Sequence, residues 1–329
     1  MKPSPILLTG ANGFVGSHIA RGLIGKGHTV RALVRPTGDR SLVSDLPIEW
    51  IVGDLDATDV LQRAVGGVSH IIHCAGRVKA PNLEAYRHTN VTGTANLIEA
   101  ASIHAGGLER FVYISSLAAG GPSEDGRFRR EEDPSQPATP YGISKREGEE
   151  LVLHEKDRLP VTVVRPAAVY GPGDTEVLAM FKTIRWHVKP VFGSRSVRAS
   201  VVHVSDLAEA ILLATFCPAG AGEMFHVAED RAYDLDELET MIAEALDTWA
   251  VRVRFPAPIV MGIAAVSEWF ASIFGVTPTF NRDKARDFMQ REWTCSIEKA
   301  QRLLGFQPRV PFASGARQTV EWYRAKGWL

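Results

Sequence analysis

Short apolar runs alternate with longer, helix-patterned segments through the first half of the chain. Between the runs, Val91, Ala95, Ile98 and Ala101 recur at the spacing of one helix face. Strands that alternate with helices predict βαβ units and a parallel sheet with helices on both faces. We therefore expect an α/β fold with a doubly wound parallel sheet. The predicted strands are 6–8, 30–34, 48–52, 70–74, 111–114 and 161–164.

The second half of the chain is less regular and predicts a smaller, mixed C-terminal lobe at the carboxyl edge of the sheet. We expect residues 1–170 to form the main domain. Residues 171–329 would mainly form a substrate-binding lobe, with some segments returning to the main sheet. The Gly-, Pro- and charge-rich stretch 120–140 is expected to be a surface loop. Candidate strands are 200–203 and 224–227, and candidate helices are 205–216, 235–246 and 311–325.

Composition narrows the function classes. Lys and Arg number 37 and Asp and Glu 38 among 329 residues, so the formal charge is −1 and gives no basic excess for nucleic-acid binding. The three scattered cysteines predict neither a disulfide framework nor a metal site, and they are typical of a reducing compartment. No apolar stretch suits a signal peptide or a membrane span. We expect a cytoplasmic protein that binds a small-molecule substrate.

A glycine-rich turn separates the first predicted strand from the first predicted helix. Glycines there permit a tight turn and let the backbone approach a pyrophosphate, which the free N–H groups of a helix N-terminus can bind. This position predicts a Rossmann-type NAD(P)-binding domain rather than a turn with only a structural role. The residues of the turn expected to contact the dinucleotide are Gly10, Asn12, Gly13, Phe14, Val15 and Gly16.

The ends of the second and third strands carry candidates for the adenosine part of the dinucleotide. An NAD enzyme would place an acidic residue after the second strand, but this chain has Arg35, which can bind a 2′-phosphate. We therefore expect NADP(H) to be preferred over NAD(H), with a solvated loop arginine as the alternative. Asp54, followed by Leu55, is placed to accept a hydrogen bond from the adenine amino group, or else only forms a turn.

Tyr141 and Lys145 are one helical turn apart on one helix face. A tyrosine with its reference pKa near 10 is a poor base, but an ammonium about 4 Å away contributes about 4 kcal/mol at an effective dielectric constant of about 20. We expect this to lower the pKa of Tyr141 by roughly three pH units, so that the phenol exchanges protons at neutral pH. Ser116, after the strand at 111–114, can hydrogen-bond a substrate oxygen.

These residues and further motifs resemble the extended short-chain dehydrogenase/reductase family along nearly the whole chain. The resemblance implies hydride transfer between nicotinamide and a substrate carbon, with Ser116, Tyr141 and Lys145 as the catalytic triad. The motifs are TGANGFVG at 9–16, GDL at 53–55, HCAG at 73–76, NVTGT at 90–94, YISS at 113–116, YGISK at 141–145, RPAAVYGPGD at 165–174, VVHVSDLAEA at 201–210 and LGFQP at 304–308.

The resemblance also implies further cofactor contacts. Lys145 would bind the nicotinamide ribose, and Ala75 and Gly76 would pass under the cofactor ribose. Asn90 would be structural or part of a proton relay, and we favour the structural role. The residues that would lie along the nicotinamide are Pro166, Ala168 and Val169.

The family contains nucleotide-sugar epimerases and dehydratases, 3β-hydroxysteroid dehydrogenases, and ketone or aldehyde reductases. Nucleotide-sugar members typically carry an Arg-Asp-aromatic sequence before the VHVxD strand. Here Arg198 is one residue out of place and no such pair follows. The stretch 113–122 and the last residues look more like the 3β-hydroxysteroid dehydrogenase branch. We expect an oxidoreductase for a lipophilic hydroxyl or ketone. The alternatives are a nucleotide-sugar epimerase or dehydratase with tightly bound NAD, and a non-catalytic dinucleotide sensor.

Other features of the sequence are compatible with more than one role. The apolar helix pattern at 255–276 predicts a core helix, with a substrate lid or a peripheral membrane contact as alternatives. Helices around 92–104 and 142–156 would form the contact of a possible homodimer. Arg195 and Arg198 are expected to be solvated loop charges, and His203 a satisfied polar residue at a strand end. The C-terminal aromatic residues expected to serve packing are Trp322, Tyr323 and Trp328.

Overall fold

The computed structural model describes residues 4–103, 107–124, 126–192, 197–255 and 292–329. Within these residues, the main sheet has seven parallel strands. Neighbouring residues of a strand point to opposite faces, so Ile6 and Leu8 pack on one side of the sheet and Leu7 on the other. Both faces are buried, as is usual for parallel sheets. In spatial order the strands are β10 (Met224–Val227), β6 (Val161–Pro166), β5 (Arg110–Ile114), β4 (His70–His73), β1 (Ile6–Thr9), β2 (Val30–Val34) and β3 (Ile48–Val52).

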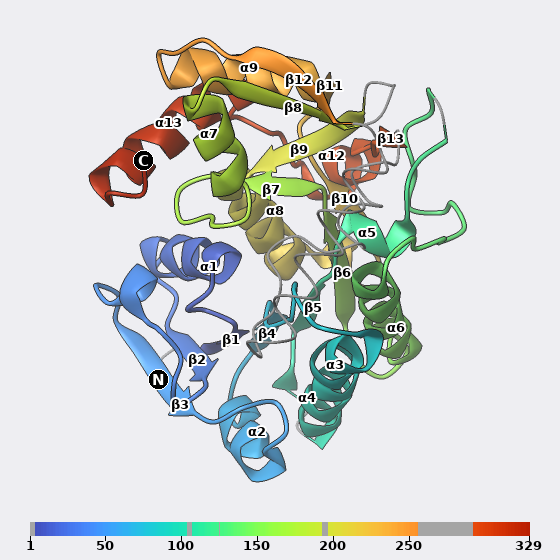
Figure 1. The fold of residues 1–329 in the computed structure, drawn as a ribbon. Coiled ribbons are helices and arrows are strands. Elements are labelled where there is room, and N and C mark those ends of the chain that lie inside the picture. The colour runs from blue at the N-terminus through green and yellow to red at the C-terminus, as the bar shows by residue number, and fades with distance from the viewer. Residues whose placement is uncertain (1–3, 104–106, 125, 193–196, 256–291) are drawn as a thin grey trace.

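Helices cover both faces of this sheet (Figure 1). One layer contains α1 (Phe14–Gly25), α8 (Val204–Phe216) and α12 (Glu298–Leu304). The other contains α2 (Thr58–Val65), α4 (Gly93–Ile103) and α6 (Pro140–His154), with α3 (Leu83–Arg87) beside α6. The doubly wound α/β fold is thus confirmed, and the helices expected near 92–104 and 142–156 are the neighbouring pair α4 and α6.

The order of the strands determines where this sheet can bind a ligand. The six predicted strands of the first half are all present, and the chain winds outward in one direction from β1 to β3 and in the other from β4 to β6. The order therefore reverses between β1 and β4. In open α/β sheets such a reversal leaves a crevice at the carboxyl ends of the strands, where ligands bind.

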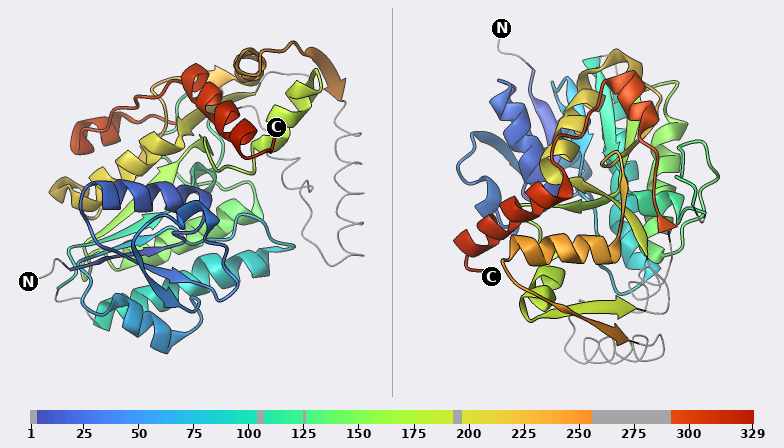
Figure 2. Two further views of the ribbon diagram at one scale, coloured as in Figure 1. Left: turned by 90° about the vertical axis from the view of Figure 1, so that its left-hand side faces the viewer. Right: turned by 90° about the horizontal axis from the view of Figure 1, so that it is seen from above.

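The C-terminal lobe packs above the carboxyl edge of the main sheet (Figure 2). Its strands are β7 (Ala168–Tyr170), β9 (Arg198–His203), β11 (Ala232–Asp234) and β13 (Glu292–Trp293) in one sheet, with β8 (Val188–Phe192) and β12 (Val251–Phe255) as a separate pair. Its helices are α7 (Leu178–Arg185), α9 (Leu235–Ala245) and α13 (Phe312–Ala325). The strand predicted at 224–227 belongs to the main sheet as β10, where it pairs with β6.

The stretch 120–140 differs from the surface loop that was expected, because part of it is buried. Arg129 is only 8% exposed, and its guanidinium donates hydrogen bonds to the carbonyl oxygens of Pro122 and Pro134. Its backbone also bridges to the strand region at Cys295. The segment 255–276 lies outside the described residues apart from its first residue. Among the helices that the structure does describe, none has the length and apolar character needed to cross a bilayer.

Candidate active site

A cleft of about 580 Å³ lies at the carboxyl ends of β1 to β4, at the point where the strand order reverses. Its volume falls in the range of small-molecule and cofactor sites. Each strand contributes the residues that follow it. Of the residues predicted to bind the dinucleotide, those that line the cleft are Gly10, Asn12, Gly13, Arg35, Asp54, Leu55, Ala75 and Gly76.

The three glycines of the turn have different roles. Gly10 has a φ of +73°, and a Cβ there would lie 2.8 Å from the Ala75 nitrogen. A Cβ on Gly16 would lie 1.9 Å from the Gly10 carbonyl oxygen, so these two glycines allow the turn itself to close. A Cβ on Gly13 would meet only that oxygen, at 3.3 Å, which leaves its other side open.

The N-terminus of α1 fits a dinucleotide phosphate. Gly13 is the N-cap residue, and no side chain caps the helix there. The first backbone N–H groups of a helix have no partner within the helix and favour an anion. Gly13 lines the cleft, so these donors face it. Phe14, Val15 and Gly16, which were also predicted to contact the dinucleotide, continue into the helix and are not part of the cleft lining.

The two candidates for the adenosine end are both exposed at the cleft. Arg35 follows β2 and makes no ion pair with any described residue. Asp54 follows β3, and its Oδ1 accepts a hydrogen bond from the backbone of Asp56 at 3.0 Å. Asp54 therefore does shape a turn. Arg40, the next arginine after Arg35, lies over the Trp50 ring at 4.7 Å instead.

The candidate triad converges beside the carboxyl end of β5. Ser116 caps α5 (Leu117–Gly120), and its side chain lies close enough to Tyr141, near the start of α6, to lower the pKa of that phenol. Lys145, one turn further along α6, donates from Nζ to the Ile114 carbonyl oxygen at 2.7 Å. Ser115, in contrast, is buried and its hydroxyl has no partner among the described residues. The serine that reaches Tyr141 is therefore Ser116.

Electrostatics at the triad differ from the expectation. Burial raises the pKa of Tyr141 to about 12, although the nearby Ser116 hydroxyl lowers it in part. Burial also lowers the pKa of Lys145 to about 8. The predicted lowering of the Tyr141 pKa by Lys145 is therefore wrong for this structure. The physical reason is that the ammonium points to the Ile114 carbonyl, while removal from water disfavours the phenolate.

Asn90 makes contacts that fit the structural role. It lies in a π-helical turn before α4, and its Oδ1 accepts a hydrogen bond from the Arg77 backbone at 2.7 Å. Its Nδ2 donates to the Arg77 carbonyl oxygen and to Ser144 Oγ, both at 3.0 Å. Both amide hydrogens are therefore engaged. The contacts tie the loop after β4 to α6, which brings Gly76 beside Lys145.

Comparison with known proteins identifies the family. The model of the NAD dependent epimerase/dehydratase family matches residues 6–228. The chain belongs to this family.

The chain is similar to several known proteins along nearly its whole length. It is 33% identical to a ceramide reductase of Caulobacter vibrioides over 98% of this chain and 96% of that protein. It is 29% identical to a UDP-glucose 4-epimerase of Vibrio cholerae, over 97% of this chain and 95% of that one. The crystal structure of gox2253 superposes with a TM-score of 0.82, at 32% identity, covering 98% of this chain and 99% of that chain.

The family members of this kind are NAD-dependent dehydrogenases, reductases and epimerases, so the chain is an enzyme of that class. The residues predicted along the nicotinamide follow the end of β6. Pro166 is the last residue of β6, and Ala168 and Val169 begin β7, where the chain crosses into the lobe. Neither they nor the triad residues are among the residues that line the cleft, but Lys145 lies next to Gly76, which is.

Sequence analysis missed several cleft residues in the loop after β4 and in the following helix. Arg77, Lys79 and His88 line the cleft, and Lys79 forms an ion pair with Glu176 of the lobe. A usable signal was present, because this loop flanks the reversal of strand order and directly follows the HCAG motif.

Three other expectations can be compared with the structure. Arg198 begins a strand, so the expected loop placement is wrong, but its side chain is 37% exposed and only 3.7 Å from Glu292, so it stays partly solvated. Arg195 lies outside the described residues. His203 bonds Ser205 through Nδ1, but its buried Nε2 has no partner among the described residues, so it is only half satisfied. The packing role of the C-terminal aromatic residues is confirmed, since they join the lobe core: Trp322, Tyr323 and Trp328.

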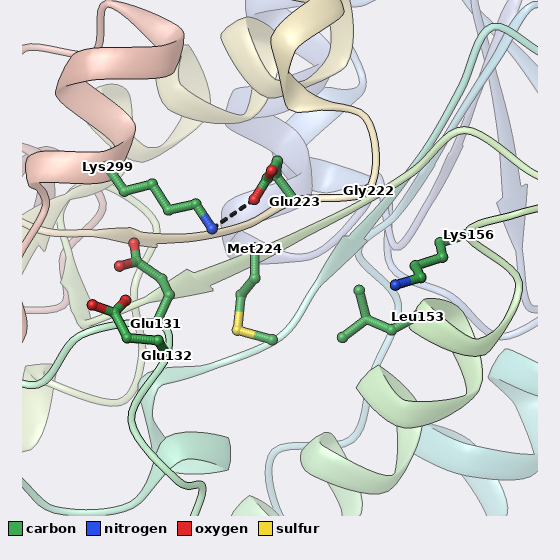
Figure 3. A pocket seen from close by; sticks show the side chains of 8 residues that line it. All are labelled: Glu131, Glu132, Leu153, Lys156, Gly222, Glu223, Met224 and Lys299. Carbon is green, nitrogen blue, oxygen red and sulfur yellow. Dashed lines mark ion pairs between the residues drawn. The ribbon is translucent and has the colours of Figure 1, made fainter.

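A second hollow of about 300 Å³ lies at the amino end of β10 (Figure 3). Lys299 is paired with Glu223 there at 2.6 Å, and Glu131 accepts a hydrogen bond from the backbone of His226 at 2.8 Å. Glu131 thus supplies a hydrogen-bond acceptor to one backbone N–H of β10, which is an edge strand of the main sheet. The hollow is far along the strands from the triad and supplies no reactive group to it.

Proposed function

We propose that this enzyme is an NAD(P)-dependent oxidoreductase that interconverts a lipophilic ketone and the corresponding alcohol. The observation that carries the proposal is the convergence of Ser116 and Tyr141, with Lys145 one turn away, at the edge of the dinucleotide cleft. A steroid-like substrate or a related alicyclic or aliphatic compound fits the class. The similarity to a ceramide reductase supports a lipophilic substrate.

The residues present fit a bound dinucleotide. The open side of Gly13 and the uncapped start of α1 would hold its pyrophosphate, and Lys145 would hold its nicotinamide ribose. When bound, the dinucleotide supplies or accepts the hydride. Tyr141 would donate a proton from its hydroxyl to the substrate oxygen during reduction, and Ser116 would hydrogen-bond the same oxygen. With a pKa of about 12, Tyr141 is protonated at neutral pH, which is the form that reduction requires.

A contact in the lobe supports a substrate without a nucleotide. Nucleotide-sugar members use an arginine near the start of the VHVxD strand to bind phosphates. Here Arg198 is paired with Glu292, and this ion pair offsets the charge that a diphosphate would need. This favours the lipophilic substrate over the nucleotide sugar.

The test is a screen of cofactor oxidation over steroids, cyclic ketones, aldehydes and nucleotide sugars, with both dinucleotides. We expect turnover of a lipophilic carbonyl, and a loss on the order of 10² or more in Tyr141→Phe with dinucleotide binding retained. Tyr86→Phe is the matched control, because its ring lies 5.9 Å from that of Tyr141. Conversion of a nucleotide sugar without net change in the cofactor would instead establish an epimerase or dehydratase.

For the cofactor, we propose that NADP(H) is preferred and that Arg35 binds its 2′-phosphate. Loss of a charge-assisted bond of about 1.5–3 kcal/mol predicts that Arg35→Ala weakens NADPH binding about 10- to 100-fold and leaves NADH binding unchanged. Arg40→Ala is the control, since that guanidinium is on Trp50. Titrations followed by cofactor fluorescence measure both. Equal effects on the two dinucleotides would remove Arg35 from this role.

A further inference from the structure

We propose that Tyr113 is a positioning residue that holds the Lys145 ammonium at the cofactor cleft through the face of its aromatic ring, an inference that rests on the proposed function. Tyr113 lies on β5 and Lys145 on α6, and both side chains are buried. Lys145 Nζ is 4.2 Å from the centroid of the Tyr113 ring. A cation at this distance over a ring face is attracted by the ring quadrupole.

The contacts around the ammonium define one open side. The Ile114 carbonyl oxygen accepts one hydrogen bond at 2.7 Å, and the Tyr113 ring closes a second side. On another side lies Gly76, where a Cβ would be 3.7 Å from Nζ. Gly76 lines the cleft, so the ammonium keeps a donor for the cofactor while the other two contacts fix its place.

A glycine on α6 makes room for the ring. A Cβ on Gly148 would lie 2.3 Å from Tyr113 Oη and 3.0 Å from Cζ, so any side chain there would push the ring away from the helix. The ring is fully buried, and its hydroxyl makes no hydrogen bond of normal length to a described residue. The ring face, and not the hydroxyl, is therefore the part of Tyr113 that contacts Lys145.

The charge of Lys145 depends on such support, because burial lowers its pKa to about 8. The titratable groups that face it are His73 on β4, Cys74 after β4, and Tyr113, Tyr141 and Glu149. His73 has a pKa of about 3 and Cys74 of about 11, so both are neutral near pH 8.

Glu149 also raises the pKa of Lys145, but its carboxylate is held by Arg165 and does not contact the ammonium. Its carboxylate forms two hydrogen bonds to Arg165, at 2.6 and 2.7 Å. The ring and the Ile114 carbonyl are thus the direct contacts that favour the protonated amine.

The test compares Tyr113→Leu, which removes the ring, with Tyr113→Phe, which keeps it. Binding of NADPH is followed by fluorescence from pH 6 to 10, a readout that needs no substrate. The pH dependence of kcat/KM is measured on the carbonyl substrate in parallel. We expect the alkaline midpoint of both to fall by about one pH unit in Tyr113→Leu and to stay at the wild-type value in Tyr113→Phe.

Phe111→Leu is the matched control, because Phe111 is equally buried on the same strand and face but does not touch Lys145. It should lose stability without moving the midpoint. If Tyr113→Leu does not fold, Tyr113→Met takes its place. An unchanged midpoint in the ring-free variant, or an equal fall in Tyr113→Phe, would overturn the proposal. A shifted binding midpoint without turnover of any carbonyl would support the role of the ring and refute the proposed function.

Discussion

Two regions of the molecule use buried polar groups differently. One is the carboxyl edge of the main sheet, and the other, here called the junction, is where Asp206 and Glu229 contact residues 309–312. At the sheet edge, Ser116 and Tyr141 lie together beside a cleft. At the junction, buried carboxylates accept backbone N–H groups. Asp206 binds the amides of Arg309 and Val310, both at 2.9 Å, and Glu229 binds that of Phe312 at 3.2 Å.

The polar groups at the sheet edge are placed for chemistry, whereas those at the junction hold the chain in place. Asp206 is buried, so its carboxylate is closed to a substrate, but the two backbone amides that it accepts fix the path of the chain. The edge of the sheet instead presents single side chains from successive strand ends, which is how open α/β sheets assemble a site. Substitutions at the junction should therefore change stability more than chemistry.

The largest effect on stability is expected from Glu149→Ala in the main-sheet half. Glu149 and Arg165 are each 2% exposed and form a bidentate ion pair, so the substitution leaves a buried, unpaired guanidinium. We expect a loss of about 3–5 kcal/mol in the free energy of unfolding, measured by chemical denaturation. Glu150→Ala, which breaks the exposed pair with Arg146, is the control and should lose at most about 1 kcal/mol. Similar losses in both would contradict the prediction.

Asp206→Ala tests the junction. The substitution leaves two backbone amides without their acceptor, and we expect a loss of about 2–3 kcal/mol. Dinucleotide binding should be unaffected, because Asp206 lies outside the cleft lining. Asp236→Ala, in the first turn of α9, removes a more exposed carboxylate that is paired with Arg252 and should cost less. Weakened NADPH binding in Asp206→Ala would show that the two regions are coupled.

The smallest change for a single residue and pH unit is expected in acid. His73, His203 and His226 have pKa values lowered by burial to about 3, 4 and 3, so they stay neutral in the folded state while the unfolded chain takes up protons below pH 6.5. These three histidines therefore destabilise the fold as pH falls below that value, by about 1.4 kcal/mol per pH unit each, whereas Glu239 and Asp174, whose pKa values burial raises to about 7 and 6, act in the opposite direction. Denaturation between pH 7.5 and 5 measures the slope, and His226→Phe should reduce it by about 1.4 kcal/mol per pH unit, the contribution of one histidine. An unchanged slope in that variant would remove His226 from the account.

Local patterns in the sequence were enough for the strands and the glycine turn, whereas the catalytic role of Ser116, Tyr141 and Lys145 came from the family resemblance and stays a prediction. These patterns did not predict features that depend on contacts between residues far apart in the sequence. The spacing of Tyr141 and Lys145 placed them on one helix face, but only the packed structure shows that the ammonium turns to the Ile114 carbonyl and the Tyr113 ring. Likewise, nothing local to Arg129 or to the strand at 224–227 reveals that one is buried in a loop and the other joins the main sheet.

The pairing of β10 with β6 has a consequence for dissecting the molecule. The backbone N–H of Ala167 donates to the carbonyl oxygen of Val227, and that of Val163 to Glu223. A fragment ending at residue 170 would leave these groups unpaired along an apolar strand and invite intermolecular strand addition. The cofactor-binding half is thus not a portable module, and shuffling it onto a different substrate lobe requires carrying the distant strand along.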